Sequence, residues 1–228
     1  MKKIIFGIFA HPDDEAFGPS GALLRETKAG NELYLITLTS GEAGTNQDND
    51  TSLGETRLRE WRAAGALMGA TDMYALDYRD SQLTNVDMIT ASERIRAIVQ
   101  PLIASASPDT VIEFITNDLN GISGHIDHIV AARAACHAFY TLKQADKRLS
   151  RVRLSCVSRS ALPTSNTHWL YMEAGRTLEE IDETVDARDL QPEIIAIMRA
   201  HHSQRADGET HIAQQGDRLG IYHFIVKQ

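Results

Sequence analysis

The sequence predicts an α/β fold of three layers, in which helices cover both faces of a mostly parallel, Rossmann-like sheet. Strand-like segments alternate along the chain with segments of helical periodicity. The strand-like segments are continuous apolar runs, as expected of parallel strands that are buried on both faces. The 228 residues, 43% of them hydrophobic, are enough for one such unit. We therefore expect a single domain over residues 1–228.

The first 150 residues contain four expected strands, each followed by an expected helix. The strands, rich in β-branched and large apolar residues, are Lys3–Ala10, Leu33–Thr39, Met73–Tyr78 and Thr110–Thr116. The helices, with apolar residues near a 3.6-residue period, are Ser20–Ala29, Thr51–Met68, Asp87–Ile103 and Asp127–Leu142. Gly30 and Gly69 mark the ends of the first two helices.

Beyond Ser150 the pattern is less regular. Short strands are expected at Val152–Ser158 and Trp169–Ala174, a helix at Pro192–His202 and a closing strand at Leu219–Val226.

Composition and charge exclude several classes of protein. A net charge of −8 disfavours nucleic-acid binding, which needs a basic face. No segment approaches the roughly 20 apolar residues of a membrane span. Cys136 and Cys156 stand in no metal-binding spacing, so two free thiols in a reducing compartment are expected. We expect a soluble, cytoplasmic protein. The sequence leaves open whether the protein forms a homo-oligomer.

Two clusters of histidine and aspartate follow strand-like runs. Ala10–Glu15 (Ala-His-Pro-Asp-Asp-Glu) comes directly after the apolar run Ile4–Phe9. Gly124–His128 (Gly-His-Ile-Asp-His) follows the apolar run Val111–Ile115. Ligands of open α/β sheets bind just beyond the carboxyl ends of the strands. We therefore expect the first and fourth strands to be neighbours and the two clusters to form one site.

The residue types in these clusters predict a divalent-metal site. His11 and Asp14 stand three residues apart in a turn, and His128 is the expected third ligand. Two imidazoles and one carboxylate leave a position open for water, which is the arrangement of catalytic rather than structural zinc. A bound Zn²⁺ lowers the pKa of that water and polarises a carbonyl oxygen. We expect one zinc ion per chain.

The remaining polar residues of the clusters have expected catalytic roles. Asp13 is free to act as a general base. His125 is the expected acid or oxyanion partner. Asp127 either holds His125 in its protonated form or orients a ligand imidazole.

Each cluster also has a purely structural interpretation. The acidic run could stabilise a helix N-terminus through the helix dipole, and His125 and His128 could lie on a solvated face with Asp127 as a helix N-cap. Both clusters stand at strand ends and carry complementary ligand types, which favours the metal site.

At these residues the chain resembles the LmbE-like / PIG-L family of zinc-dependent N-deacetylases. Ala10–Glu15 matches the family's first motif without change, and Gly124–His128 matches its second except that Ile126 replaces proline. Smaller matches extend over most of the chain, at Ser40–Glu42, Gly54–Glu60, Asp80 and Ala200–Gln204.

The resemblance implies the same roles that the residue chemistry suggests. It implies zinc ligation by His11, Asp14 and His128, a general base at Asp13 and an acid or oxyanion partner at His125. It also implies that Arg57 and Asp80 contact sugar hydroxyls. For Arg57 an ion pair with Glu60, three residues along a helix, is the alternative.

The leading hypothesis is a zinc-dependent hydrolase that removes an acetyl group from an N-acetylated amino sugar of the N-acetylglucosamine type, or from its conjugate. The alternatives are a metallohydrolase acting on a different amide or ester, and a metal-binding Rossmann-like module without turnover. The Gly-rich loop of a dinucleotide-binding module is missing after the first strand. Thr45–Ser52 and Leu162–Thr167 are the segments where substrate specificity is expected.

Overall fold

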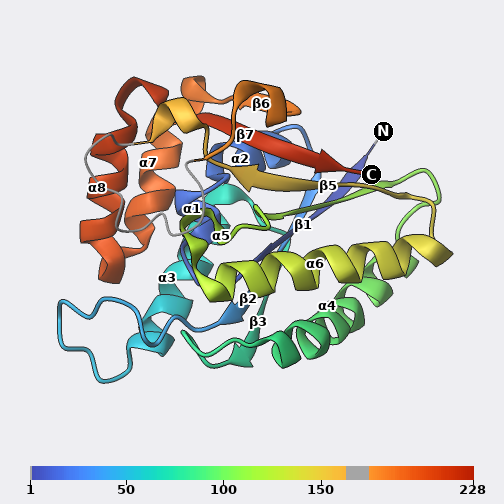
Figure 1. The fold of residues 1–228 in the computed structure, drawn as a ribbon, viewed down its shortest axis with the longest axis horizontal. Coiled ribbons are helices and arrows are strands. Elements are labelled where there is room, and N and C mark those ends of the chain that lie inside the picture. The colour runs from blue at the N-terminus through green and yellow to red at the C-terminus, as the bar shows by residue number, and fades with distance from the viewer. Residues whose placement is uncertain (1, 163–174) are drawn as a thin grey trace.

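The computed structural model describes residues 2–162 and 175–228 and confirms the predicted fold class (Figure 1). In this part of the chain seven strands form one sheet in the order β3-β2-β1-β4-β5-β7-β6. The strands are β1 (Lys3–Phe9), β2 (Glu32–Thr39), β3 (Asp72–Tyr78), β4 (Val111–Asn117), β5 (Leu149–Cys156), β6 (Glu183–Asp186) and β7 (Ile221–Lys227). The pairs from β3 to β5 are parallel, whereas β7 runs antiparallel to both β5 and β6.

The α-helices connect these strands and flank the sheet. They are α1 (Asp14–Phe17), α2 (Ser20–Lys28), α3 (Leu53–Met68), α4 (Asn85–Ala104), α5 (Gly121–Gly124), α6 (Ile126–Ala145), α7 (Gln191–Ala200) and α8 (Arg205–Gln215). Among the described residues, none of the helices combines the length and the hydrophobicity needed to cross a bilayer.

The expected elements are found with boundaries shifted by a few residues, apart from Trp169–Ala174, which lies outside the described residues. Sequence reasoning missed β6, α8 and the single-turn helices α1 and α5. Strand β6 is four residues long and has no apolar run, and α8 is largely exposed with one buried residue, Gly208. Neither element carries the hydrophobic periodicity on which the prediction depended. Cys136 and Cys156 are free thiols, as expected.

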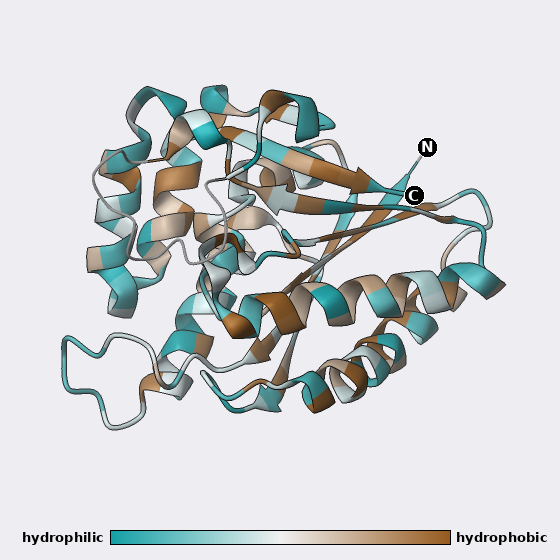
Figure 2. Ribbon diagram, viewed as in Figure 1, coloured by the Kyte–Doolittle hydropathy of each residue, from teal (hydrophilic) through white to brown (hydrophobic). Residues whose placement is uncertain are grey.

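The core lies in two layers, one on each face of the sheet. On one face, residues such as Phe6, Phe114 and Phe139 pack between the sheet and the α4–α6 pair. On the other face, Trp61 and Leu35 belong to the layer covered by α2, α3 and α7. Figure 2 shows the apolar residues concentrated on the strands and on the sheet-facing sides of the helices. The central strands β1, β2 and β4 are therefore buried on both faces, which is why their sequences are continuous apolar runs.

The order in which successive strands are added to the sheet reverses at β1: β2 and β3 lie on one side of it, and β4 and β5 lie on the other. Strand β1 pairs with β2 on one side and with β4 on the other, so the loops that follow β1 and β4 leave the sheet side by side. This is the topological switch point at which open α/β sheets bind their ligands. The fold thereby brings the two histidine-containing segments together.

A buried group of charges joins the antiparallel edge to the parallel strands. Arg153 on β5 is 2% exposed. Its guanidinium lies 2.9 Å from Glu26, 3.3 Å from Glu113 and 3.4 Å from Glu183. Glu113 is 3% exposed and depends on such cations for compensation of its charge.

Replacing Arg153 should therefore destabilise the fold far more than replacing a surface arginine. We expect Arg153→Met to lower the free energy of unfolding by about 3 kcal/mol, because Glu113 loses a buried partner. The matched control is Arg94→Met, whose partner Asp77 is 86% exposed at its side chain; its cost should stay below about 1 kcal/mol. Urea unfolding followed by circular dichroism measures both, and equal losses would contradict the role of the buried group.

Candidate metal centre

Three predicted ligands meet beyond the carboxyl ends of β1 and β4. His11 and Asp14 follow β1, and His128 lies in the first turn of α6. His11 Nδ1 is 3.1 Å from His128 Nε2. The Asp14 carboxylate is 3.1 Å from His128 Nε2 and 3.8 Å from His11 Nδ1. Tetrahedral coordination with bonds of about 2.0–2.2 Å places ligand atoms roughly 3.3–3.6 Å apart, so these three groups fit one small cation.

The second nitrogen of His11 is held by two carboxylates. His11 Nε2 lies 3.0 Å from Asp80 Oδ1 and 3.2 Å from Asp127 Oδ2. Since a carboxylate only accepts hydrogen bonds, Nε2 carries a proton, and Nδ1 is the nitrogen that faces Asp14 and His128 and can serve as the ligand atom. Backbone N–H groups of Ser81 and Leu83 also donate to Asp127, at 2.7 and 3.2 Å.

The other two ligands are fixed in the same way. The Nδ1 atom of His128 is 3.1 Å from the carbonyl oxygen of Gly121, to which it donates, so Nε2 presents its lone pair. Asp14 Oδ2 accepts hydrogen bonds from the N–H groups of Ala10 and His11, at 3.1 and 3.0 Å. Each donor atom is therefore oriented by the protein itself.

The electrostatics of the cluster favour a cation. Burial alone would lower the pKa of His11, but the nearby Asp127, Asp80 and Asp14 carboxylates raise it to about 10. Burial would raise the pKa of Asp14, but His128 and His11 lower it. The site thus concentrates negative charge around a buried imidazole, which a divalent cation would neutralise.

His11 belongs to two groups whose ligand atoms lie close enough to hold a metal. One combines it with His125 and His128, and the other combines it with Asp80 and Asp127. The second group uses the Nε2 side of His11, where the proton is shared with carboxylates. The geometry therefore favours a cation on the Nδ1 side, next to Asp14 and His128.

Asp13 lies beside this cluster in a strained backbone conformation. Its φ of 124° is outside the regions that non-glycine residues normally adopt. The Arg57 guanidinium donates to Asp13 Oδ2 at 2.8 Å. Burial raises the pKa of Asp13 to about 6, although the charge of Arg57 opposes that rise. A carboxylate with this pKa can accept a proton near neutral pH.

Arg57 is nearly fully buried and faces Asp13 rather than Glu60. It also donates to the carbonyl oxygens of Pro12 and Gly41, each at 2.7 Å. Gly41 has a φ of +68°, and a Cβ atom there would lie 2.5 Å from the guanidinium carbon. The glycine of the Ser-Gly-Glu motif thus makes room for Arg57. Glu60 instead accepts hydrogen bonds from Ser203.

The structure places Asp80 and Asp127 next to His11 rather than next to His125. Asp80 Oδ2 accepts from the N–H of Ala43 at 2.9 Å, and its Oδ1 faces His11. Burial would raise the pKa of Asp80, but His11 brings it down to about 2. Of the two roles expected for Asp127, the geometry matches orientation of a ligand imidazole.

His125 caps helix α6. Its Nδ1 accepts a hydrogen bond from the N–H of Asp127 at 3.2 Å, so Asp127 is not the N-cap residue. The proton of neutral His125 is therefore on Nε2. Burial lowers the pKa of His125, and the charges of His128 and His11 add to this effect. His125 thus presents a neutral N–H donor beside the metal ligands, and its ring stacks on that of His128 at 4.9 Å.

Sequence reasoning gave no role to Glu15, whose side chain accepts a hydrogen bond from the backbone of Asp13. Glu15 and His201 are both fully buried. The carboxylate of Glu15 accepts from the N–H of Asp13 at 3.2 Å and lies 3.0 Å from His201 Nε2. The only available signal was the pairing of the Asp-Asp-Glu run with the late Ala-His-His-Ser-Gln segment. Such a long-range contact cannot be read from one sequence.

The fold and the cluster define an α/β protein with a candidate His/Asp metal site at its switch point. Residues 6–139, more than half of the chain, match the family model described as "PIG-L: GlcNAc-PI de-N-acetylase". The chain therefore belongs to the PIG-L family, as the motifs predicted.

Named relatives and solved structures extend the likeness. The chain is 27% identical to a "Probable N-acetyl-alpha-D-glucosaminyl L-malate deacetylase 2" of Bacillus anthracis, over 91% of this chain and 84% of that protein. The fold resembles an N,N'-diacetylchitobiose deacetylase of Pyrococcus horikoshii (TM-score 0.65, 20% identity, 99% and 83% coverage). It also resembles a 4-carboxy-2-hydroxymuconate hydratase of Pseudomonas putida (TM-score 0.69, 14% identity, 100% and 97% coverage).

Metal affinity should depend on the residues that orient His11. We expect Asp127→Asn to weaken zinc binding about tenfold to a hundredfold, because the carboxylate no longer fixes the tautomer of the ligand. His128→Ala should weaken binding further, because a ligand itself is lost. Competition with a chromophoric chelator measures both. The exposed His202→Ala is the control, and unchanged affinity in Asp127→Asn would contradict this assignment.

Proposed function

We propose that this protein is a zinc-dependent hydrolase that removes the acetyl group from an N-acetylglucosamine-type amino sugar or its conjugate. The observation that carries the proposal is the convergence of three oriented donor atoms, on His11, Asp14 and His128, with the Arg57-bound carboxylate of Asp13 beside them. The family and the relatives named for deacetylation of such sugars support the same reaction.

The donor set suits zinc because it combines two imidazole nitrogens with one carboxylate. When bound there, zinc supplies Lewis acidity toward the amide carbonyl and toward water. Asp13 accepts the proton of the attacking water. Arg57 holds the Asp13 carboxylate in place by its 2.8 Å hydrogen bond, and the Glu15 carboxylate holds the Asp13 backbone.

His125 provides a hydrogen-bond donor in the proposed mechanism. Its Nε2–H points away from the capping bond and donates a hydrogen bond to the developing oxyanion. Water forms a bond to the carbonyl carbon, the proton that Asp13 has accepted passes to the nitrogen, and the C–N bond then breaks to give acetate and the free amine. Asp80 and Asp127 serve as positioning residues for His11 in this scheme. A direct contact of Arg57 or Asp80 with the sugar is not part of this scheme, because both side chains are engaged inside the site.

Replacing the base should abolish turnover without loss of the metal. We expect Asp13→Asn to lower kcat for acetate release from N,N'-diacetylchitobiose or N-acetylglucosamine by about a hundredfold to ten-thousandfold, because an amide cannot accept the proton. Zinc content, measured by mass spectrometry, should stay at about one per chain.

Asp77→Asn, an exposed carboxyl change at the edge of the sheet, is the matched control for this experiment. Full activity of Asp13→Asn would remove the general base from the scheme. Zinc-loaded wild type that releases no acetate from any N-acetylglucosamine conjugate would refute the proposed reaction itself.

A further inference from the structure

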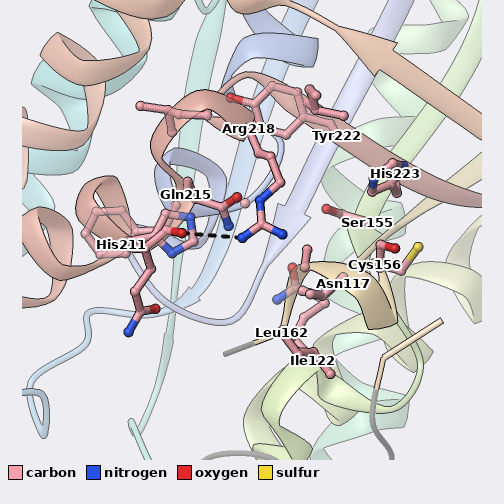
Figure 3. Close-up of a pocket in the computed structure, with 18 of the residues that line it drawn as sticks. Asn117, Ile122, Ser155, Cys156, Leu162, His211, Gln215, Arg218, Tyr222 and His223 are labelled. Atoms are coloured by element: carbon pink, nitrogen blue, oxygen red, sulfur yellow. Dashed lines mark hydrogen bonds between the residues drawn. The ribbon is translucent and has the colours of Figure 1, made fainter. Parts of the chain in front are cut away.

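A cavity of about 470 Å³ opens beside the metal centre. It shares Asp14 and His128 with that centre and extends toward the segment between α8 and β7. Figure 3 shows Arg218 and Tyr222 on one side of the cavity and Asn117 and Ile122 on the other. Its volume is in the range of small-molecule sites, and the acyl-amide of a substrate at the metal would leave the rest of that molecule in this space.

Most of the described lining is apolar or uncharged. The apolar side chains include Phe17, Ile122, Leu178, Met198 and Ile221. Among the described lining residues, only Asp14 and Arg218 carry a formal charge. Asp14 belongs to the metal centre, so Arg218 is the sole fixed charge of the remainder of the described lining.

Arg218 lacks the carboxylate partner that many arginines of this chain have. It donates to the carbonyl oxygens of Ser160 at 3.2 Å and Gln214 at 3.5 Å, and it pairs with no carboxylate in the part of the chain that the structure describes. Arginines that do pair with a carboxylate include Arg25, Arg94, Arg148, Arg188, Arg199 and Arg205.

The carbonyl contacts orient the guanidinium, and no carboxylate among the described residues compensates its charge. A guanidinium has five N–H donors in a planar fork that matches a carboxylate or a phosphate. In Figure 3 the Arg218 fork reaches into the cavity, with Gln215 beside it and Ser155 and Asn117 ahead of it. Apolar neighbours strengthen the attraction between such a fork and an anion, since they displace water.

We propose that Arg218 binds an anionic group, a carboxylate or a phosphate, on the part of the substrate remote from the acetamide. The substrate class is then an N-acetyl amino sugar whose aglycone is negatively charged, rather than a neutral disaccharide. This inference rests on the proposed deacetylase function for the placement of the acetamide at the metal. The apolar lining accommodates the carbon skeleton that joins the sugar to the anion.

The test compares three substrates that share the same N-acetylglucosamine. The methyl glycoside is neutral, the L-malate conjugate carries carboxylates, and the 1-phosphate carries a phosphate. For wild type we expect kcat/KM to be at least about tenfold higher for one anionic substrate than for the methyl glycoside, which corresponds to one charge-assisted hydrogen-bonded pair. The better of the two anionic substrates identifies the anion.

In Arg218→Gln that ratio should fall to near one, mainly through KM, and Arg218→Lys should retain part of it. Arg62→Gln is the matched control, because Arg62 is also exposed and also contacts only a carbonyl, that of Leu58. It should leave the ratio unchanged. A wild type without preference for either anion, or an Arg218→Gln variant that keeps the preference, would overturn the inference.

Calorimetric binding separates this inference from the proposed reaction. The three compounds are titrated into zinc-loaded Asp13→Asn and into the Asp13→Asn/Arg218→Gln double variant. Tighter binding of an anionic compound that requires Arg218 supports the anion site even if wild type shows no turnover. Equal binding of the neutral and anionic compounds refutes it, even if wild type is an active deacetylase.

Discussion

The hydrogen bonding of His11 is the constraint on which the rest of the site depends. Asp80 follows β3, Asp127 lies in the first turn of α6, and His11 follows β1, so segments of three separate elements meet at one imidazole ring. The two carboxylates fix the proton on Nε2, and only then can Nδ1 face Asp14 and His128 as a ligand. Assembly of the metal centre thus requires that the sheet order is correct, because β1 must lie between β2 and β4.

Around this ring the chain places charges that compensate one another only in part. Arg57 moderates the charge of Asp13, whereas His11 and His128 face the carboxylates of Asp14, Asp80 and Asp127. The carboxylates outnumber the cationic groups, so the net charge of the cluster is negative, as a cation site requires. The strained φ of Asp13 shows that this arrangement costs conformational energy. The fully buried Glu15–His201 pair stabilises this backbone conformation, because Glu15 accepts a hydrogen bond from the N–H of Asp13.

The sequence allowed the fold class, most elements and the meeting of the two clusters to be predicted, because these depend on local periodicity and on the rules of parallel sheets. The partners of Asp127 and Arg57 could not be predicted in the same way. The helical spacing of Arg57 and Glu60 suggested a surface pair, but tertiary packing turns Arg57 inward to Asp13 and leaves Glu60 to Ser203. Side-chain choice among several nearby charges depends on distances that only the folded chain sets.

The fold by itself does not define the chemistry. A hydratase and a deacetylase resemble this architecture at TM-scores of 0.69 and 0.65, so the sheet does not distinguish the two reactions, and the side chains at the switch point must do so. The residues proposed for the reaction and the residue proposed for substrate specificity lie in different parts of the chain. His11, Asp14 and His128 belong to the loops after β1 and β4, within the part of the chain that matches the family model, whereas Arg218 lies beyond it at the antiparallel edge. Under the proposed function, the residue proposed to select the substrate thus lies on a different part of the sheet from the residues proposed to perform hydrolysis.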